Sequence, residues 1–144
     1  MRSDRLRVRL MRLDWSQWLL IAEAALAVTS ASLAIRLLPF ARTIRLGSRR
    51  LATRPPVDCN PLFCEIRWSV MAVSARLPWK ALCFQQGLAL QWMLRRRGID
   101  ARLHYGIGRD PDGELAAHVW ISAGEDIVIG GEQASAFRAV TAYP

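Results

Sequence analysis

Two residues of this 144-residue chain could together carry out acyl-transfer chemistry. Cys83 opens the stretch CFQQGLALQWMLRRRG, and His118 lies in the later stretch AAHVWIS. A cysteine thiolate attacks a carbonyl carbon, and a nearby imidazole can take up and return the protons of that reaction. The chain's second histidine is His104, which we interpret as a partly exposed strand residue. The pair to position is therefore Cys83 and His118.

The element that carries Cys83 has the spacing of a helix. Its inward positions follow an i, i+4, i+7, i+11 stripe, made of Cys83, Gly87, Leu90 and Leu94. Residues 95–97 are arginines in the expected last turn, and Gly98 is a natural residue to end the helix. Cys83 thus falls at the helix N-terminus, where a thiol ionises more easily and unpaired backbone N–H groups can stabilise an oxyanion. We expect the three arginines to form a solvated helix end; contact with an acidic leader or partner is the alternative.

After Gly98 the apolar period changes from helical to alternating. Strands are predicted over 101–107, 115–122 and 127–129, with turn residues at 109–113 and 124–126. Helices followed by an antiparallel meander give an α+β fold. His118 lies on the second strand, with Trp120 on the same face by parity. Trp120 either walls the site or packs in the core.

The first half of the chain is a helical lead-in. We predict a basic arm over 1–14, one long helix or two shorter ones over 15–46 broken near Pro39, and a linker over 47–58. A further helix begins at Asn60-Pro61, stops before Pro78, and buries one face made of Phe63, Ile66, Val70 and Val73. The predicted organisation is thus a lead-in over 1–58 and a domain over 59–144.

Residues 15–40 are apolar enough to raise the question of a membrane. The run is too long for the apolar region of a signal peptide and long enough to span a bilayer. Glu23 and Arg36 would be costly in lipid, so we favour a soluble or peripheral helix over a span. We expect a cytoplasmic protein, with membrane association through 15–40 as the alternative.

Charge and cysteine content narrow the class of protein. The net charge is +8, and Lys80 is the only lysine among 20 basic residues. The arginine blocks at 2–12 and 95–97 are not interleaved with aromatic strand residues, so we expect no nucleic-acid partner. Cys59, Cys64 and Cys83 are an odd number, which indicates a reducing compartment. No second pair of Cys or His completes a zinc set, and we expect neither metal nor cofactor.

The stretch CFQQGLALQWMLRRRGIDARLHYGI followed by AAHVWI resembles the transglutaminase-like cysteine peptidases of lasso-peptide biosynthesis. The resemblance implies a papain-like core, in which a Cys-bearing helix packs on an antiparallel sheet. It implies a leader peptidase that cuts a ribosomally made precursor, with Cys83 as nucleophile and His118 as general base and acid. It also implies a separate leader-recognition protein and an ATP-dependent, asparagine-synthetase-like cyclase as partners, because residues 1–58 do not resemble a recognition domain.

The third member of the expected triad is missing from its usual place. The family places an Asp twelve residues after the His, and here that position is Gly130. If the turn centres on Gly124, His118 pairs near Gly130, and Glu132 lies on the same face. Glu132 is therefore our candidate third member, and a backbone carbonyl orienting the imidazole is the alternative. The missing Asp keeps open a second function, a non-catalytic, membrane-associated adaptor. A third is an acyltransferase with an amine acceptor, because the same Cys–His pair supports either nucleophile in the second step.

Overall fold

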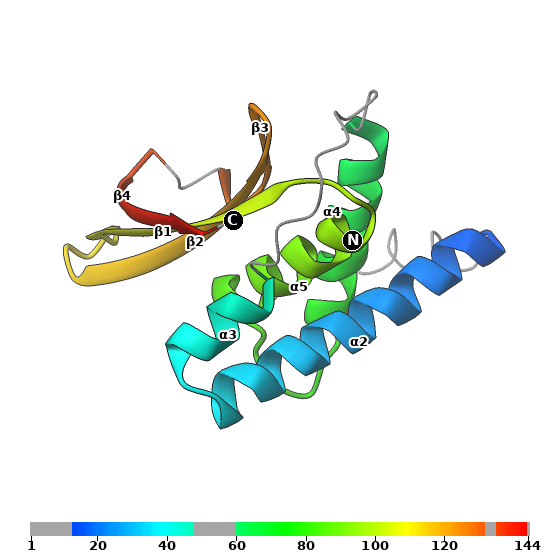
Figure 1. Ribbon diagram of the computed structural model, residues 1–144. Helices are drawn as coiled ribbons and strands as arrows, with labels where there is room; N and C mark the ends of the chain where they lie inside the picture. The colour runs from blue at the N-terminus through cyan, green and yellow to red at the C-terminus, as the bar shows by residue number, and fades with distance from the viewer. Residues whose placement is uncertain (1–12, 48–59, 132–134, 144) are drawn as a thin grey trace.

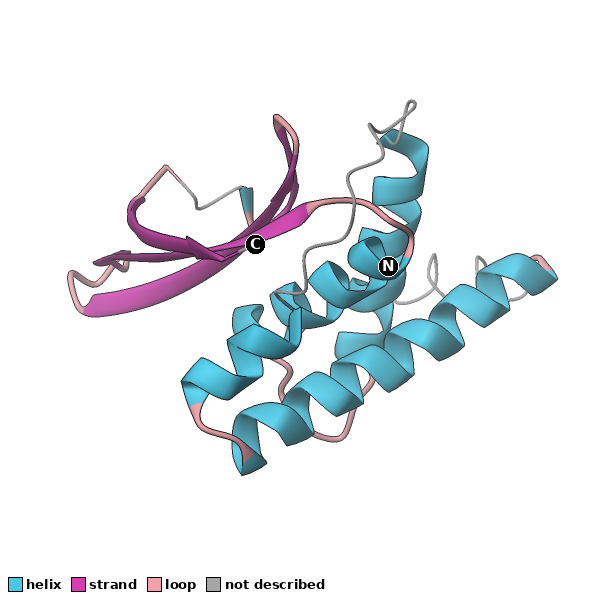
Figure 2. Ribbon diagram, in the orientation of Figure 1, coloured by secondary structure: helices cyan, strands magenta, loops and turns pink. Residues whose placement is uncertain are grey.

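The protein folds into a layer of helices against one face of an antiparallel sheet. The computed structural model describes residues 13–47, 60–131 and 135–143. The helices are α2 (Trp15–Leu37), α3 (Phe40–Gly47), α4 (Asn60–Ser74) and α5 (Cys83–Arg96). The strands are β1 (Ala101–Arg109), β2 (Leu115–Ala123), β3 (Asp126–Ile129) and β4 (Phe137–Tyr143). Figures 1 and 2 show the helices gathered on one side and the twisted sheet on the other, which confirms the predicted α+β class.

The lead-in forms two helices, with the break at Pro39 as predicted. α2 ends at Leu37, and α3 starts again at Phe40. The Thr43 hydroxyl donates to the carbonyl of Ala34 at 3.3 Å, which ties the second helix back to the first. The expected domain boundary at residue 58 lies outside the described residues and stays a prediction.

α4 presents the apolar face that its sequence predicts. Phe63, Ile66, Val70 and Val73 are all buried. The helix ends at Ser74, before Pro78. Helices stop before a proline because its ring and missing N–H cannot continue the hydrogen-bond ladder.

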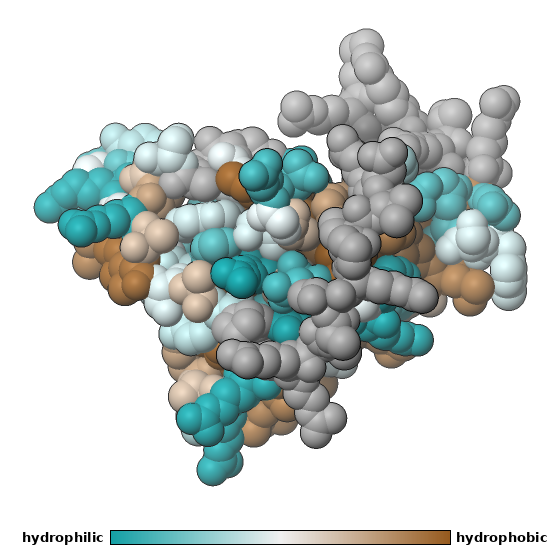
Figure 3. Space-filling model, turned by 45° about the horizontal axis from the view of Figure 1, so that its top comes forward, coloured by the Kyte–Doolittle hydropathy of each residue, from teal (hydrophilic) through white to brown (hydrophobic). Residues whose placement is uncertain are grey.

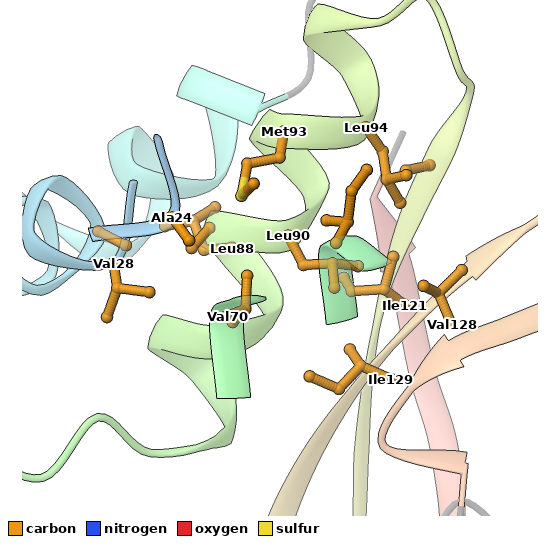
Figure 4. Packing of buried hydrophobic residues seen from close by; sticks show 14 of the residues in the cluster. Ala24, Val28, Val70, Leu88, Leu90, Met93, Leu94, Ile121, Val128 and Ile129 are labelled. Carbon is orange, nitrogen blue, oxygen red and sulfur yellow. The ribbon is translucent and has the colours of Figure 1, made fainter. Parts of the chain in front are cut away.

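α5 is the central helix of the core. Figure 4 shows Leu88, Leu90 and Leu94 between Ala24 and Val28 of α2 on one side and Ile121 of β2 on the other. The close approach to β2 depends on a residue without a side chain, because a Cβ at Gly87 would lie 2.9 Å from a Val119 methyl. Burying large aliphatic side chains contributes about 1.5–3 kcal/mol each. The helix that carries Cys83 is therefore held from two sides.

The end of α5 differs from the predicted solvated terminus. Arg95 is buried, and Arg97 forms a two-pronged pair with Glu23 of α2, at 2.9 and 2.7 Å. Only Arg96 keeps a largely exposed side chain. The prediction is wrong for Arg95, which is buried, whereas Arg96 and Arg97 remain exposed residues and Arg97 also pairs with the carboxylate that α2 supplies.

The sheet has the strand order β3-β2-β1-β4. β1 pairs with β2 and with β4, both antiparallel, so β4 adds an edge strand that the sequence interpretation missed. The predicted register of the β2–β3 hairpin is wrong. A bulge shifts the pairing between Ile121 and Ser122, and the ladder ends at the pair Ile121–Ile129. His118 therefore has no ladder partner on β3.

Candidate active site

Cys83 is the first residue of α5 and is partly exposed. The helix start is fixed by local hydrogen bonds. The Leu82 N–H donates to Gln85 Oε1 at 3.0 Å, and Gln86 Nε2 donates to the carbonyl of Ala81 at 2.8 Å. The first N–H groups of a helix have no acceptor within the helix, and they carry its positive dipole end. The Cys83 sulfur is thus carried by an electropositive end that is anchored in the core.

His118 lies on β2, half-buried, with one ring nitrogen engaged. Its Nε2 is 3.0 Å from the carbonyl oxygen of Gly130. A carbonyl can only accept a hydrogen bond, so Nε2 carries the proton, and Nδ1 of the neutral ring is the unprotonated nitrogen. This tautomer is the one that can accept a proton at Nδ1.

One pocket brings the two residues together. It has a volume of about 320 Å³ and is lined by Arg67, Met71, Cys83, Gln86, His118, Val119, Ile129 and Gly130. Cys83 is a free thiol, and the hydrogen bond of the His118 ring is to the Gly130 carbonyl rather than to the Cys83 sulfur. The pocket walls are mainly apolar, and Arg67 adds a positive charge.

Gly130 cannot carry the side chain that the family pattern places there. Its φ is +80°, a conformation that residues with a Cβ rarely adopt. A Cβ at this position would lie 2.7 Å from the Val119 carbonyl oxygen and 3.1 Å from His118 Nε2. The group beside His118 Nε2 is instead the backbone carbonyl of Gly130. Glu132, the predicted third member, lies outside the described residues.

An aromatic stack supports the His118 ring from the side. Trp120 is buried and lies on the same strand face as His118, as predicted, with the two ring centroids 6.3 Å apart. The other flank of Trp120 stacks on His104 at 5.4 Å, nearly parallel. Phe137 of β4 lies 5.2 Å from His118. The His118 imidazole therefore has two aromatic neighbours, Trp120 and Phe137.

His104 has a structural environment of its own. It is half-buried, and its Nε2 lies 2.7 Å from the Ser122 hydroxyl. Burial lowers the pKa of His104 below its ordinary value, and the positive charge of Arg102 lowers it further. His104 does not line the pocket that contains Cys83.

The sequence interpretation missed part of the pocket lining. Gln86 lies three residues after Cys83, so helical spacing puts it on the same side of α5, and that signal was available. Arg67 and Met71 are exposed positions of α4, and their pattern is that of any solvated helix face. Within the described ranges, no group of three or more His, Cys, Asp or Glu side chains could hold a metal ion.

Comparison with known proteins gives one match. The model of the transglutaminase-like superfamily matches residues 25–142, which is most of the chain and includes α2 from Ala25 onward. No curated protein and no solved structure matches the chain. The match extends over both halves of the pocket and over all four strands.

Proposed function

This chain belongs to the transglutaminase-like superfamily, whose members are cysteine-protease or acyltransferase types of enzyme, and from that premise we propose that it is a cysteine peptidase with Cys83 as nucleophile and His118 as base. The single observation that carries the proposal is the shared pocket. Cys83, at the positive end of α5, and His118, in the tautomer with a bare Nδ1, line the same cavity.

The reaction follows from these atoms. Cys83 gives its proton to Nδ1 of His118, and its sulfur attacks the carbonyl carbon of the scissile peptide bond. The oxyanion that forms lies near the first N–H groups of α5, which are donors without helical acceptors. His118 then protonates the departing amine, leaving a thioester on Cys83. Water, deprotonated by the same imidazole, hydrolyses the thioester and restores the thiol.

The Gly130 carbonyl serves as the third member in this proposal. It accepts a hydrogen bond from the Nε2–H group of His118, with Nε2 and the oxygen 3.0 Å apart, and this bond fixes the orientation and the tautomer of the ring. A neutral carbonyl stabilises an imidazolium less than a carboxylate would. A cysteine nucleophile tolerates this, because a thiolate–imidazolium pair can form before substrate attack. The role of Glu132 stays open within the proposal.

The substrate that we propose is the leader of a ribosomally made lasso-peptide precursor. The support is the likeness of residues 83–107 and of AAHVWI to the leader peptidases of that system. The proposed partners are a separate leader-recognition protein and the ATP-dependent cyclase that closes the ring. An amine-accepting acyltransferase is the second candidate, since the thioester could be resolved by either nucleophile. The absent acid keeps a non-catalytic adaptor as the third.

The test is cleavage of a precursor peptide in the presence of its recognition protein. Wild type is expected to release a leader that ends in a free carboxylate, whereas Cys83→Ala and His118→Ala leave the precursor uncut. Mass spectrometry with an added primary amine separates the two enzyme classes, because an acyltransferase joins the leader to the amine. Equal cleavage by all three proteins would refute the peptidase, and no cleavage by wild type would favour the adaptor.

A further inference from the structure

The outer face of α2 is apolar and exposed to solvent. Trp15 is 75% exposed, Leu26 71% and Leu37 76%. Leu19 and Leu33 are about half exposed, and the five residues follow an i, i+4, i+11, i+18, i+22 pattern along one side of the helix. Figure 1 shows α2 along the margin of the molecule, with the other helices on its inner side. A stripe of this length on one helix is more than scattered surface leucines.

We propose that this face docks on an anionic lipid membrane, with α2 lying in the plane of the headgroups rather than crossing the bilayer. α2 is long and apolar enough to span. Its inner face, however, is part of the protein core through Leu20, Ala24 and Val28, which are buried. Spanning would remove these side chains from their packing. A surface position keeps the core intact and buries only the outer stripe.

An ion pair also argues against a span. Glu23, in the first half of α2, is held by Arg97 of α5 at 2.7 Å. The Arg97 hydrogen bonds keep the pKa of Glu23 below its ordinary value, against the opposing effect of burial. A carboxylate fixed to a neighbouring helix cannot move to the middle of a bilayer without losing that partner.

The positive charges near α2 favour an anionic lipid surface over a second copy of the chain as the partner of this face. Arg36 lies in the last turn of α2, and Arg42 and Arg45 are exposed on the adjoining α3. In the sequence, five arginines precede α2 within residues 2–12. Basic residues are attracted to an anionic lipid surface, and tryptophans prefer the headgroup level. A second copy of a chain with charge +8 would instead be repelled.

A groove continues the apolar stripe toward α5. It has a volume of about 450 Å³ and is lined by Leu19, Ala22, Glu23, Leu26, Ala27, Ser30, Trp92, Met93 and Arg96. The Arg96 side chain is 77% exposed, and its guanidinium lies 3.9 Å from the Glu23 carboxylate. Figure 3, which presents another face of the molecule, shows hydrophobic residues exposed beside hydrophilic ones there as well. The groove offers apolar walls to an acyl chain.

The test is co-sedimentation of the full chain with lipid vesicles. The protein is expected to sediment with vesicles of phosphatidylcholine and phosphatidylglycerol. Its affinity for vesicles of phosphatidylcholine alone is expected to be at least tenfold lower. Leu26→Glu is expected to weaken binding to the anionic vesicles at least tenfold, because it puts a charge into the apolar stripe. The matched control is Leu115→Glu, on the β1–β2 hairpin, at 75% exposure. It should bind like wild type, and circular dichroism shows that both variants are folded.

Three results would overturn the proposal. The first is a wild type that stays in the supernatant with both kinds of vesicle. The second is equal binding by Leu26→Glu and Leu115→Glu. The third is retention of the protein in the membrane after alkaline carbonate washing, which marks a span. Release by carbonate is the expected outcome. The proposal does not depend on catalysis, so precursor cleavage and vesicle binding fail independently.

Discussion

Replacing Gly130 tests the most unusual feature of the pocket. Alanine at this position must adopt a φ near +80°, which costs about 1–2 kcal/mol for a residue with a Cβ. Its methyl group must also fit 2.7 Å from the Val119 carbonyl oxygen, a backbone atom that cannot swing away. Overpacking of this kind costs about 1–3 kcal/mol. The expected loss of stability is therefore about 2–5 kcal/mol, or about 10 °C in Tm for a chain of this size.

A matched glycine separates the two contributions to that loss. Gly113 has a φ of +82°, and a Cβ there meets nothing within 4 Å. Gly113→Ala is expected to cost only the conformational part, about 1–2 kcal/mol. Both variants are measured by thermal and denaturant unfolding. Equal losses would refute the close packing of residue 130 against β2, and with it the physical reason for glycine here.

The same position has a consequence for activity. In folded Gly130→Asp protein, the carboxylate is expected not to restore a triad, because its Cβ would already lie 3.1 Å from His118 Nε2. Cleavage of the precursor per folded molecule should fall, since the carbonyl that holds His118 is displaced. An increase in turnover over wild type would contradict the assignment of the Gly130 carbonyl as the orienting group.

Two further predictions concern pH and stability. The folded-state pKa of Glu23 is lowered chiefly by its hydrogen bonds to Arg97. The ion pair therefore stabilises the fold at pH values above the usual carboxyl pKa, and this stabilisation is lost as the pH falls through the lowered pKa. Glu23→Gln should cost up to about 1 kcal/mol at pH 7 in urea unfolding and nothing at low pH; an equal cost at both would contradict this. Burial lowers the pKa of His104 in the folded protein. As the pH drops below the ordinary histidine pKa, the unfolded chain therefore binds a proton before the folded one does, and the stability of the fold decreases. His104→Phe should flatten the stability profile between about pH 7 and 5, and an unchanged slope would count against it.

Local patterns predicted the helices well, because each sequence stripe has a single core to face. Gly87, Leu90 and Leu94 of the α5 stripe and the face from Phe63 to Val73 are buried as expected, while Cys83 at the helix start is partly exposed. The start of α5 at Cys83 is also where the sequence puts it. Spacing alone could predict these features, since helical packing needs only the residues of one segment and their period.

Long-range pairing was harder to predict. The segment 137–143 forms an edge strand beside β1, and its exposed Val140 gives little of the inside–outside contrast that marks a strand. The bulge after Ile121 moved the register of the β2–β3 hairpin, and no residue type announces it. The His118 side chain contacts the Gly130 carbonyl beyond the end of the β2–β3 ladder. The sequence allowed a backbone carbonyl as the group that orients the His118 ring, but it could not decide between that carbonyl and a side chain such as Glu132.

The cleavage rate of Cys83→Ala, compared with that of Cys64→Ala, tests the central claim most directly. Cys64 is an exposed cysteine of α4 that does not line the pocket, so it controls for the loss of a thiol as such. With the proposed precursor and recognition protein at saturation, Cys83→Ala is expected to lower kcat at least about a thousandfold. Cys64→Ala should leave kcat within about twofold of wild type. A Cys83→Ala protein that cuts the precursor at the wild-type rate would contradict the account.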